Sequence, residues 1–202
     1  LSGGAFVEAV SVCHVNIDGP QFESACLAET RWVSSQLDES TLDYVLVGSA
    51  PLESPRIDQI LESLKRFPKV YSIRQIISYE PSWPRNKKRG NFLENPQWLD
   101  GFSQLASHNL AFDLQINPNQ FDKAVDLVTK HPEIPIIIGH LGSPTLADLH
   151  EKQEYWEGMR KFASLEHVSI KISMLSYIDP AWDESSLIEE TVHQVIELFG
   201  ME

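Results

Sequence analysis

The chain has 202 residues, of which 42% are hydrophobic and 22% charged, and it carries a formal net charge of -13. This composition excludes disordered and collagen-like classes, and the negative charge disfavours a nucleic-acid partner, whose phosphates it would repel. The length suits one domain over residues 1–202. Since no stretch approaches roughly 18 apolar residues and the start lacks a secretory pattern, we expect a cytoplasmic protein without membrane contact.

Six short runs rich in Val and Ile recur between longer segments with helical patterning. Strands joined by a helix-sized crossover are parallel, because only a hairpin can join antiparallel neighbours in a few residues. The alternation therefore predicts repeated βα units. The expected strands cover residues 6–17, 44–49, 69–77, 110–116, 134–140 and 167–173.

Pairs of a capping residue and proline mark the expected helix starts. They are Ser54-Pro55, Asn95-Pro96 and Asn117-Pro118, each with proline at the first helical position. Phe67-Pro68 and His131-Pro132 are expected to end helices, since the residue before proline avoids the α region. The loops that follow the strands are longer, above all over residues 78–94, which indicates where function lies.

Two of the expected strands have one apolar and one polar face. In residues 110–116, the alternation places Ala111, Asp113 and Gln115 on one face, and in residues 167–173 it places Ser169, Lys171 and Ser173 together. An open sheet covered by helices on both faces would give nearly continuous apolar strands. The pattern favours a barrel, whose inner strand face opens into a site near the carboxyl ends.

Several ionisable side chains sit in these otherwise apolar strands: Arg74, Asp113, His140 and Lys171. Such groups are rarely buried without a partner, because desolvating a lone charge is costly. One interpretation is a functional site near the strand ends; the other is a structural salt bridge in which Asp113 neutralises Arg74 or Lys171. His14 lies in phase with the interior of the first strand and is either a site residue or a hydrogen-bonded core histidine.

Four segments in this order resemble the amidohydrolase-related (amidohydrolase 2) family: Ile73-Arg74-Gln75, the run 110–115, the run 139–144 (GHLGSP) and Ile170-Lys171-Ile172-Ser173. The likeness is greatest to its branch of TIM-barrel metal-dependent hydrolases that includes sugar lactonases and pyrone dicarboxylate lactonases. It implies an α/β fold, an incomplete TIM (β/α) barrel whose six parallel strands correspond to strands 2 to 7. The family's first strand, with a His-x-His pair, and its last, with an aspartate, have no counterpart here, so the resemblance implies a fragment.

The resemblance also implies roles for individual residues. His140 matches a histidine that binds metal or, in metal-free lactonases, polarises the substrate or moves protons, and Asp113 would assist it. Arg74 and Lys171, together with His14 and Gln115, would bind the substrate. A divalent ion, Zn or Mn, is one alternative and a metal-free site the other. The fourth expected strand offers Asp113 and Gln115 where many metal-binding relatives have a histidine, which weakens the case for a metal and favours the lactonase branch.

The sequence therefore predicts a hydrolase that opens a small lactone or related cyclic ester or amide by water attack on the carbonyl. Its partner would be a small-molecule substrate, with an anionic one among the alternatives. The rival hypothesis is a non-catalytic barrel remnant that binds or acts as a scaffold. A nucleotide-binding enzyme is disfavoured because the glycine-rich phosphate motifs do not occur. Exposed edge strands in an incomplete barrel would also favour self-association.

Overall fold

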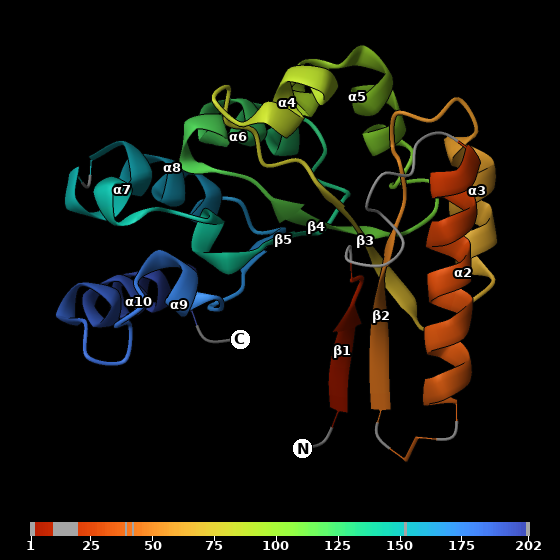
Figure 1. Cartoon of the computed structure of the whole chain (residues 1–202), viewed down its shortest axis with the longest axis horizontal. Helices are drawn as coiled ribbons and strands as arrows, with labels where there is room; N and C mark the ends of the chain where they lie inside the picture. Colours follow the sequence, from red (N-terminus) through yellow and green to blue (C-terminus); the bar gives the residue numbers. More distant parts are fainter. Residues whose placement is uncertain (1–2, 10–19, 39, 42, 152, 201–202) are drawn as a thin grey trace. The chain divides into compact units, whose positions relative to one another are not determined.

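The structure is a computed structural model that describes residues 3–9, 20–38, 40–41, 43–151 and 153–200. It contains six strands, which follow one another across one sheet in chain order (Figure 1). The strands are β1 (Gly3–Val7), β2 (Asp43–Ser49), β3 (Val70–Ile76), β4 (Ala111–Gln115), β5 (Ile136–Ile138) and β6 (Val168–Ile170).

The described helices alternate with these strands, as the sequence predicts. No described helix is long and apolar enough to span a bilayer. The α-helices are α2 (Pro20–Leu37), α3 (Ile57–Lys65), α4 (Pro84–Arg89), α5 (Pro96–Ser103), α6 (Phe121–Thr129), α7 (Leu146–Glu151), α8 (Gln153–Ala163), α9 (Leu175–Ile178) and α10 (Ser186–Phe199), and the short 3-10 helices are η1 (Phe92–Glu94), η2 (Pro118–Gln120) and η3 (His140–Gly142).

The predicted proline signals coincide with helix ends, except Ser54-Pro55: α3 begins only at Ile57, with Arg56 as its N-cap residue. Asn95 caps α5, because its Oδ1 accepts the amides of Gln97 at 3.0 Å and Trp98 at 3.5 Å. Asn117 caps η2, which leads directly into α6. Helices α3 and α6 end two residues before Phe67 and His131, the residues that precede the stopping prolines. Local chemistry thus sets most of the boundaries that the sequence pattern indicates.

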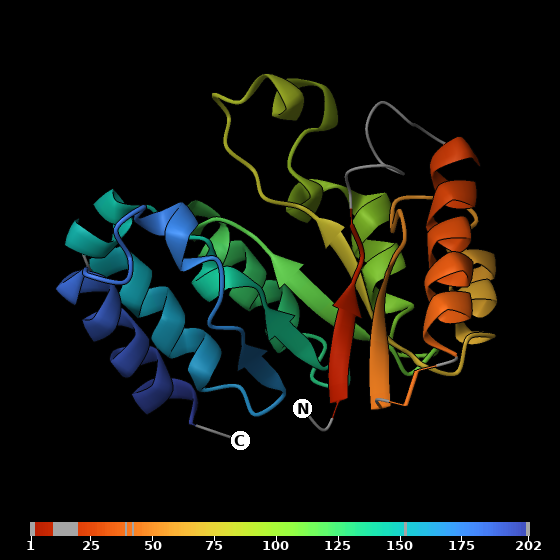
Figure 2. The ribbon, with the colours of Figure 1, turned by 60° about the horizontal axis from the view of Figure 1, so that its bottom comes forward.

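Contacts divide the chain into two compact units, the first formed by Leu1–Gln75 and Glu94–Asp113 and the second by Ile76–Leu93 and Leu114–Glu202. In the first unit, β1 pairs parallel to β2, and β2 parallel to β3. Helices α2 and α3 lie along one face of these strands, as two views show (Figures 1 and 2). A core of Trp98, Phe102 and Phe112 packs at ring separations of 5.3–5.9 Å beside this sheet.

The first strand lies earlier than the sequence predicts. It begins at Gly3 and ends at Val7, whereas the expected strand covers 6–17, whose residues 10–17 lie outside the described part. Glycine is a poor strand former, which hides this strand from pattern analysis. Here it is needed: a Cβ on Gly3 would lie 2.7 Å from the Asp43 carbonyl oxygen of β2.

The register of β2 and β3 fixes which side chains face away from the helices. Gly48, opposite Ile73, faces them, since a Cβ there would contact Thr30 and Leu64 of α2 and α3. The neighbouring pairs, with Ser72 and Arg74 of β3, therefore point to the other face. β3 therefore also has a polar face, formed by Ser72 and Arg74, on the side away from these helices.

In the second unit, β5 pairs parallel to β6, with Ile138 opposite Ile170. Helix α8 packs against α6, α7, α10 and β6. Both strands are shorter than expected, so His140, Lys171 and Ser173 follow the strands instead of lying within them.

Candidate active site

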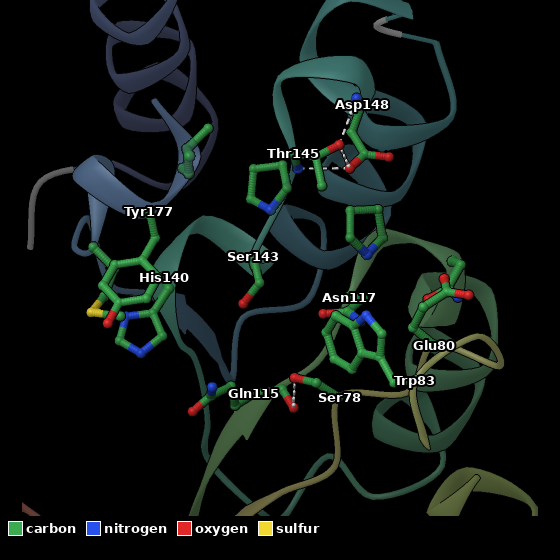
Figure 3. A pocket seen from close by; sticks show the side chains of 15 residues that line it. Ser78, Glu80, Trp83, Gln115, Asn117, His140, Ser143, Thr145, Asp148 and Tyr177 are labelled. Carbon is green, nitrogen blue, oxygen red and sulfur yellow. Dashed lines mark hydrogen bonds between the residues drawn. The ribbon is translucent and has the colours of Figure 1, made fainter. Parts of the chain in front are cut away.

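The second unit contains a cavity of about 710 Å³ (Figure 3). Its lining comes from segments at or after the carboxyl ends of four strands, where parallel α/β folds place their sites. The lining residues are Ser78, Glu80 and Trp83 after β3; Gln115, Asn117, Pro118 and Asn119 at the end of β4; His140, Ser143, Pro144, Thr145 and Asp148 after β5; and Met174, Tyr177 and Ile178 after β6.

Two aromatic side chains form exposed parts of this lining. Trp83 is 37% exposed and Tyr177 is 82% exposed. In Figure 3, Trp83 lies on the opposite side of the cavity from Tyr177 and His140. An aromatic ring with an open face packs well against the apolar face of a small cyclic molecule. The cavity therefore combines flat apolar surfaces with hydroxyl, amide and carboxylate groups.

Two carboxylates also line the cavity, and each is held by its own loop. Asp148 accepts hydrogen bonds from the amide of Thr145 at 2.7 Å and from its hydroxyl at 2.6 Å. Glu80 accepts the amide of Ser82 at 3.1 Å. These bonds fix acceptor oxygens at the rim, and such oxygens suit ligands that carry hydroxyl or amide donors.

Gln120 joins the two loops that form one wall of the cavity. Its side chain is 2% exposed; Oε1 accepts the amides of Tyr79 at 2.8 Å and Asn117 at 3.1 Å, and Nε2 donates to the Ile77 carbonyl at 3.0 Å. One buried amide thus satisfies backbone groups from the segments that follow β3 and β4. In the sequence, the Asn117-Pro118 capping signal indicated a helix start at this point but did not identify Gln120.

His140 stands on a left-handed turn. The φ angles are 55° at His140, 55° at Leu141, 74° at Gly142 and 53° at Ser143. For residues other than glycine this conformation costs roughly 1–2 kcal/mol each, and such strain tends to gather at functional sites. The turn presents the histidine to the cavity, and its Nδ1 lies 2.8 Å from the Ser173 hydroxyl oxygen.

The turn is held by buried neighbours in the second unit. The Tyr155 hydroxyl donates to the Leu141 carbonyl at 2.9 Å, and burial raises the pKa of Tyr155 well above its ordinary range, so this donor keeps its proton. Phe121 fills the space behind the turn: a Cβ on Gly142 would lie 2.6 Å from its Cζ, and one on Gly158 would lie 2.3 Å from its Cδ2. The strained backbone is therefore enforced by packing.

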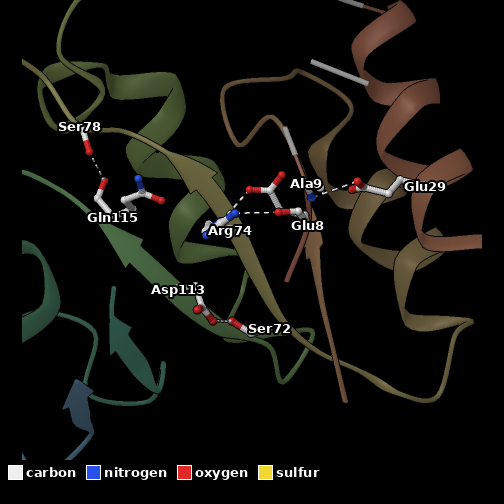
Figure 4. A network of polar contacts seen from close by, with 8 residues as sticks. All are labelled: Glu8, Ala9, Glu29, Ser72, Arg74, Ser78, Asp113 and Gln115. Carbon is white, nitrogen blue, oxygen red and sulfur yellow. Dashed lines mark hydrogen bonds and ion pairs between the residues drawn. The ribbon is translucent and has the colours of Figure 1, made fainter. Parts of the chain in front are cut away.

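The first unit holds two of the predicted ionisable residues, Arg74 and Asp113 (Figure 4). Arg74 Nε lies 2.6 Å from the Glu8 carboxylate, and its Nη2 donates to the Glu8 carbonyl at 2.7 Å. Burial raises the pKa of Glu8 above its usual 4.5, while Arg74 opposes that shift. Glu29, which accepts the Ala9 amide at 3.0 Å, also has a pKa raised by burial.

Asp113 is 3% exposed and accepts a hydrogen bond of 2.8 Å from the Ser72 hydroxyl. The sequence suggested Arg74 or Lys171 as the salt-bridge partner of Asp113. In the structure Arg74 forms a salt bridge with Glu8. Because β1 ends at Val7, Glu8 lies directly after the carboxyl end of this strand.

The predicted site residues are distributed as follows. His140 and Gln115 line the cavity of the second unit. Lys171 belongs to the same unit, where its amide and carbonyl bond to Ile138 and Leu141 at 2.8 and 3.1 Å. Arg74 and Asp113 belong to the first unit. His14 lies outside the described residues. A common mouth for Arg74, Asp113, His140 and Lys171 stays a prediction.

The cavity also contains residues that no motif marked. Trp83 and Glu80 lie in the long loop 78–94, whose length pointed to function without naming them. Tyr177 and Met174 follow β6 in a segment without a recognisable pattern. Met174 itself has φ 60°, which no sequence signal indicates.

A metal centre does not assemble from the described residues alone. Among them, no group of three or more His, Cys, Asp or Glu side chains is placed to hold an ion. Protein zinc sites use three or four such ligands. His140, which the resemblance implies as a possible metal ligand, is not part of such a group among the described residues.

Comparison with known proteins gives a consistent family. The model of the family described as Amidohydrolase (Amidohydro_2) matches residues 82–202. An uncharacterized protein, y4mH, of Sinorhizobium fredii is 26% identical over 176 residues, which cover 86% of this chain and 58% of that protein. The L-fucono-1,5-lactonase of Burkholderia ambifaria is 23% identical over 179 residues, covering 85% and 57%. The chain thus matches less than two thirds of the length of either relative.

Solved structures share the fold. An amidohydrolase from Burkholderia multivorans with bound HEPES superposes with a TM-score of 0.72 at 19% identity, over 99% of this chain and 66% of that one. The same amidohydrolase with bound zinc gives 0.69 at 18% identity, over 99% and 65%. Amidohydrolase 2 from Bifidobacterium longum gives 0.60 at 21% identity, over 98% and 62%.

These likenesses confirm the predicted fold class, an α/β arrangement of six parallel strands that matches an incomplete TIM barrel. The family model covers more than half of the chain and includes the loop after β3 from residue 82, the turn of His140 and the segment after β6. The chain belongs to the Amidohydrolase (Amidohydro_2) family.

Proposed function

We propose that this protein is a hydrolase that opens a small lactone or related cyclic ester, with the substrate bound in the cavity that His140 lines. The observation that carries the proposal is this cavity, at the carboxyl ends of four parallel strands and with a strained turn presenting the histidine. Family membership and the likeness to a protein named L-fucono-1,5-lactonase support it.

The chemistry follows from the groups in the cavity. A water molecule attacks the ring carbonyl carbon and loses a proton to His140, which acts as the general base. The tetrahedral oxyanion then collapses, the ring C–O bond breaks, and His140 returns the proton to the leaving alkoxide, which gives a hydroxy acid. Arg74 and Lys171 remain the predicted cations for a substrate carbonyl or carboxylate. A Zn or Mn ion would require metal-binding side chains in addition to those of the described residues.

The size and lining of the cavity support a monosaccharide-sized lactone. Small-molecule pockets commonly enclose roughly 300–1,000 Å³, and this one measures about 710 Å³. Trp83 and Tyr177 would pack against the ring faces, while Glu80 and Asp148 would accept hydrogen bonds from ring hydroxyls.

The test is a panel of sugar lactones, pyrone lactones and simple cyclic esters, whose hydrolysis is measured as acid release in weakly buffered solution. His140→Ala should lower kcat/KM by roughly 100-fold or more, as expected for loss of a general base. The matched control is His193→Ala, because this exposed histidine lies on α10 and not in the cavity. Equal values of kcat/KM in the two variants would show that His140 takes no part in the reaction.

The second candidate is a non-catalytic binding protein. The observation that favours it is that the described residues do not assemble a metal-ligand group. Saturation-transfer NMR with the same lactones separates the two functions. Contact between a lactone and the cavity without acid release would support the binding protein, while release that depends on His140 would exclude it.

A further inference from the structure

The imidazole of His140 contacts the hydroxyl of Ser173. Nδ1 lies 2.8 Å from the Ser173 oxygen, and both side chains are half-buried. Ser173 comes three residues after β6 and His140 two residues after β5. The two segments reach this contact from neighbouring parallel strands of the same unit.

The backbone between these strands keeps the two residues in register. Beyond the last ladder pair, the Lys171 amide donates to the Ile138 carbonyl at 2.8 Å, and the Leu141 amide donates to the Lys171 carbonyl at 3.1 Å. The contact between His140 and Ser173 therefore lies at the end of a continuous series of backbone bonds. Such a contact is reproducible in position, because each partner is fixed by main-chain geometry.

The turn leaves His140 little other freedom. Its backbone and the three following residues adopt positive φ angles, and Tyr155 and Phe121 hold the turn from behind. With the Cα–Cβ direction set in this way, the remaining choices are the ring orientation and the nitrogen that carries the proton. In a histidine the hydrogen bond at one nitrogen decides the state of the other.

We propose that Ser173 is a positioning residue that holds Nδ1–H of neutral His140 and so assigns the acid-base chemistry to Nε2. In this arrangement the Ser173 oxygen accepts the Nδ1 proton, and Nε2 carries the lone pair that takes a proton from water. The proposal rests on the function proposed for His140, but its structural content, the tautomer, is measurable without substrate.

The direct test is ¹⁵N NMR of the histidine rings in the full chain. In the unaltered protein above its imidazole pKa, Nδ1 of His140 should show the protonated, pyrrole-like shift and Nε2 the pyridine-like shift. Ser173→Ala should move both shifts toward the mixed tautomers of free histidine, and Ser173→Thr, which keeps the hydroxyl, should restore them. His167, whose Nε2 lies 3.1 Å from the Val128 carbonyl, serves as the internal reference.

Ser169→Ala is the matched control, since Ser169 lies on β6, shortly before Ser173, and its hydroxyl donates to the Ile136 carbonyl at 3.3 Å, away from His140. In a lactone assay, Ser173→Ala should lower kcat on the order of tenfold with little change in KM, and Ser173→Thr should recover most of the rate. A pyridine-like Nδ1 in the unaltered protein, or His140 shifts that ignore Ser173→Ala, would overturn the proposal. If no lactone is hydrolysed, the proposed function fails while the NMR result still decides the tautomer.

Discussion

The turn beneath His140 should be the least tolerant part of the second unit, and Gly142→Ala measures this directly. The new methyl group meets two penalties. The backbone φ of 74° at position 142 is unfavourable for alanine by about 1–2 kcal/mol. Its Cβ would also lie 2.6 Å from Phe121 Cζ and 3.0 Å from Cε1, and overpacking of this kind costs about 1–3 kcal/mol. Together these give an expected loss of about 2–5 kcal/mol in the free energy of unfolding.

A double-mutant cycle separates the two penalties. Phe121→Leu removes the two clashing ring atoms, so Gly142→Ala should cost about 1–3 kcal/mol less in that background. Gly90→Ala is the control: it also has a positive φ, of 71°, but a Cβ there has no atom within 4 Å. Its cost should add to that of Phe121→Leu within about 0.5 kcal/mol.

The assay is urea unfolding followed by circular dichroism, with hydrogen exchange of the α6 and α8 amides to locate the effect. The reasoning requires coupling between positions 121 and 142. Additive costs for Gly142→Ala and Phe121→Leu would refute it, because they would show that the ring does not press on the turn.

Three further outcomes follow from the first unit and from the strand order. Burial raises the pKa of folded Glu8 above 4.5, so the native state binds more protons than the unfolded state, and the stability that Glu8 contributes is present below pH 4.5 and is lost as pH rises through the raised pKa. Glu8→Gln should therefore flatten the dependence of the unfolding free energy on pH, measured by urea unfolding at a series of pH values. An unchanged pH dependence would contradict this reasoning. Ser72→Ala should lower the free energy of unfolding by about 1.5–3 kcal/mol, because it removes a hydrogen-bond donor to buried Asp113. Ser35→Ala, at an exposed position, should change it by under about 0.5 kcal/mol. Equal values for the two variants would show that the hydrogen bond to Asp113 is dispensable. With β1 and β6 at the ends of the strand order, self-association should increase with concentration in sizing chromatography, and a monomer at every concentration would count against it.

The sequence predicted the repeating βα pattern because each strand is a short apolar run and several helices begin at a capping residue with proline. It failed at β1, where Gly3 and Gly4 are poor strand formers, although the close approach of the Asp43 carbonyl requires glycine at position 3. Pattern analysis assigns strands by the periodicity of apolar residues. A strand that contains glycine because a neighbouring backbone approaches closely lacks this periodicity.

The candidate site divides in a similar way. His140 and Gln115 could be predicted because they interrupt or follow apolar strands in a recognisable order. Trp83 and Tyr177 could not, since loop residues have no periodicity and their position depends on contacts such as those of Gln120. The pairing of Arg74 with Glu8 was also hidden, because it depends on the start of β1.

The backbone of residues 140–143 has a consequence for engineering a new specificity. A segment whose handedness is imposed by packed neighbours tolerates few sequences, so random libraries there would return mostly misfolded clones. Trp83 and Tyr177 present open rings with much of their surface in solvent, so they can be diversified at little cost to folding. Directed evolution of this scaffold should therefore keep the left-handed turn constant and randomise the aromatic walls.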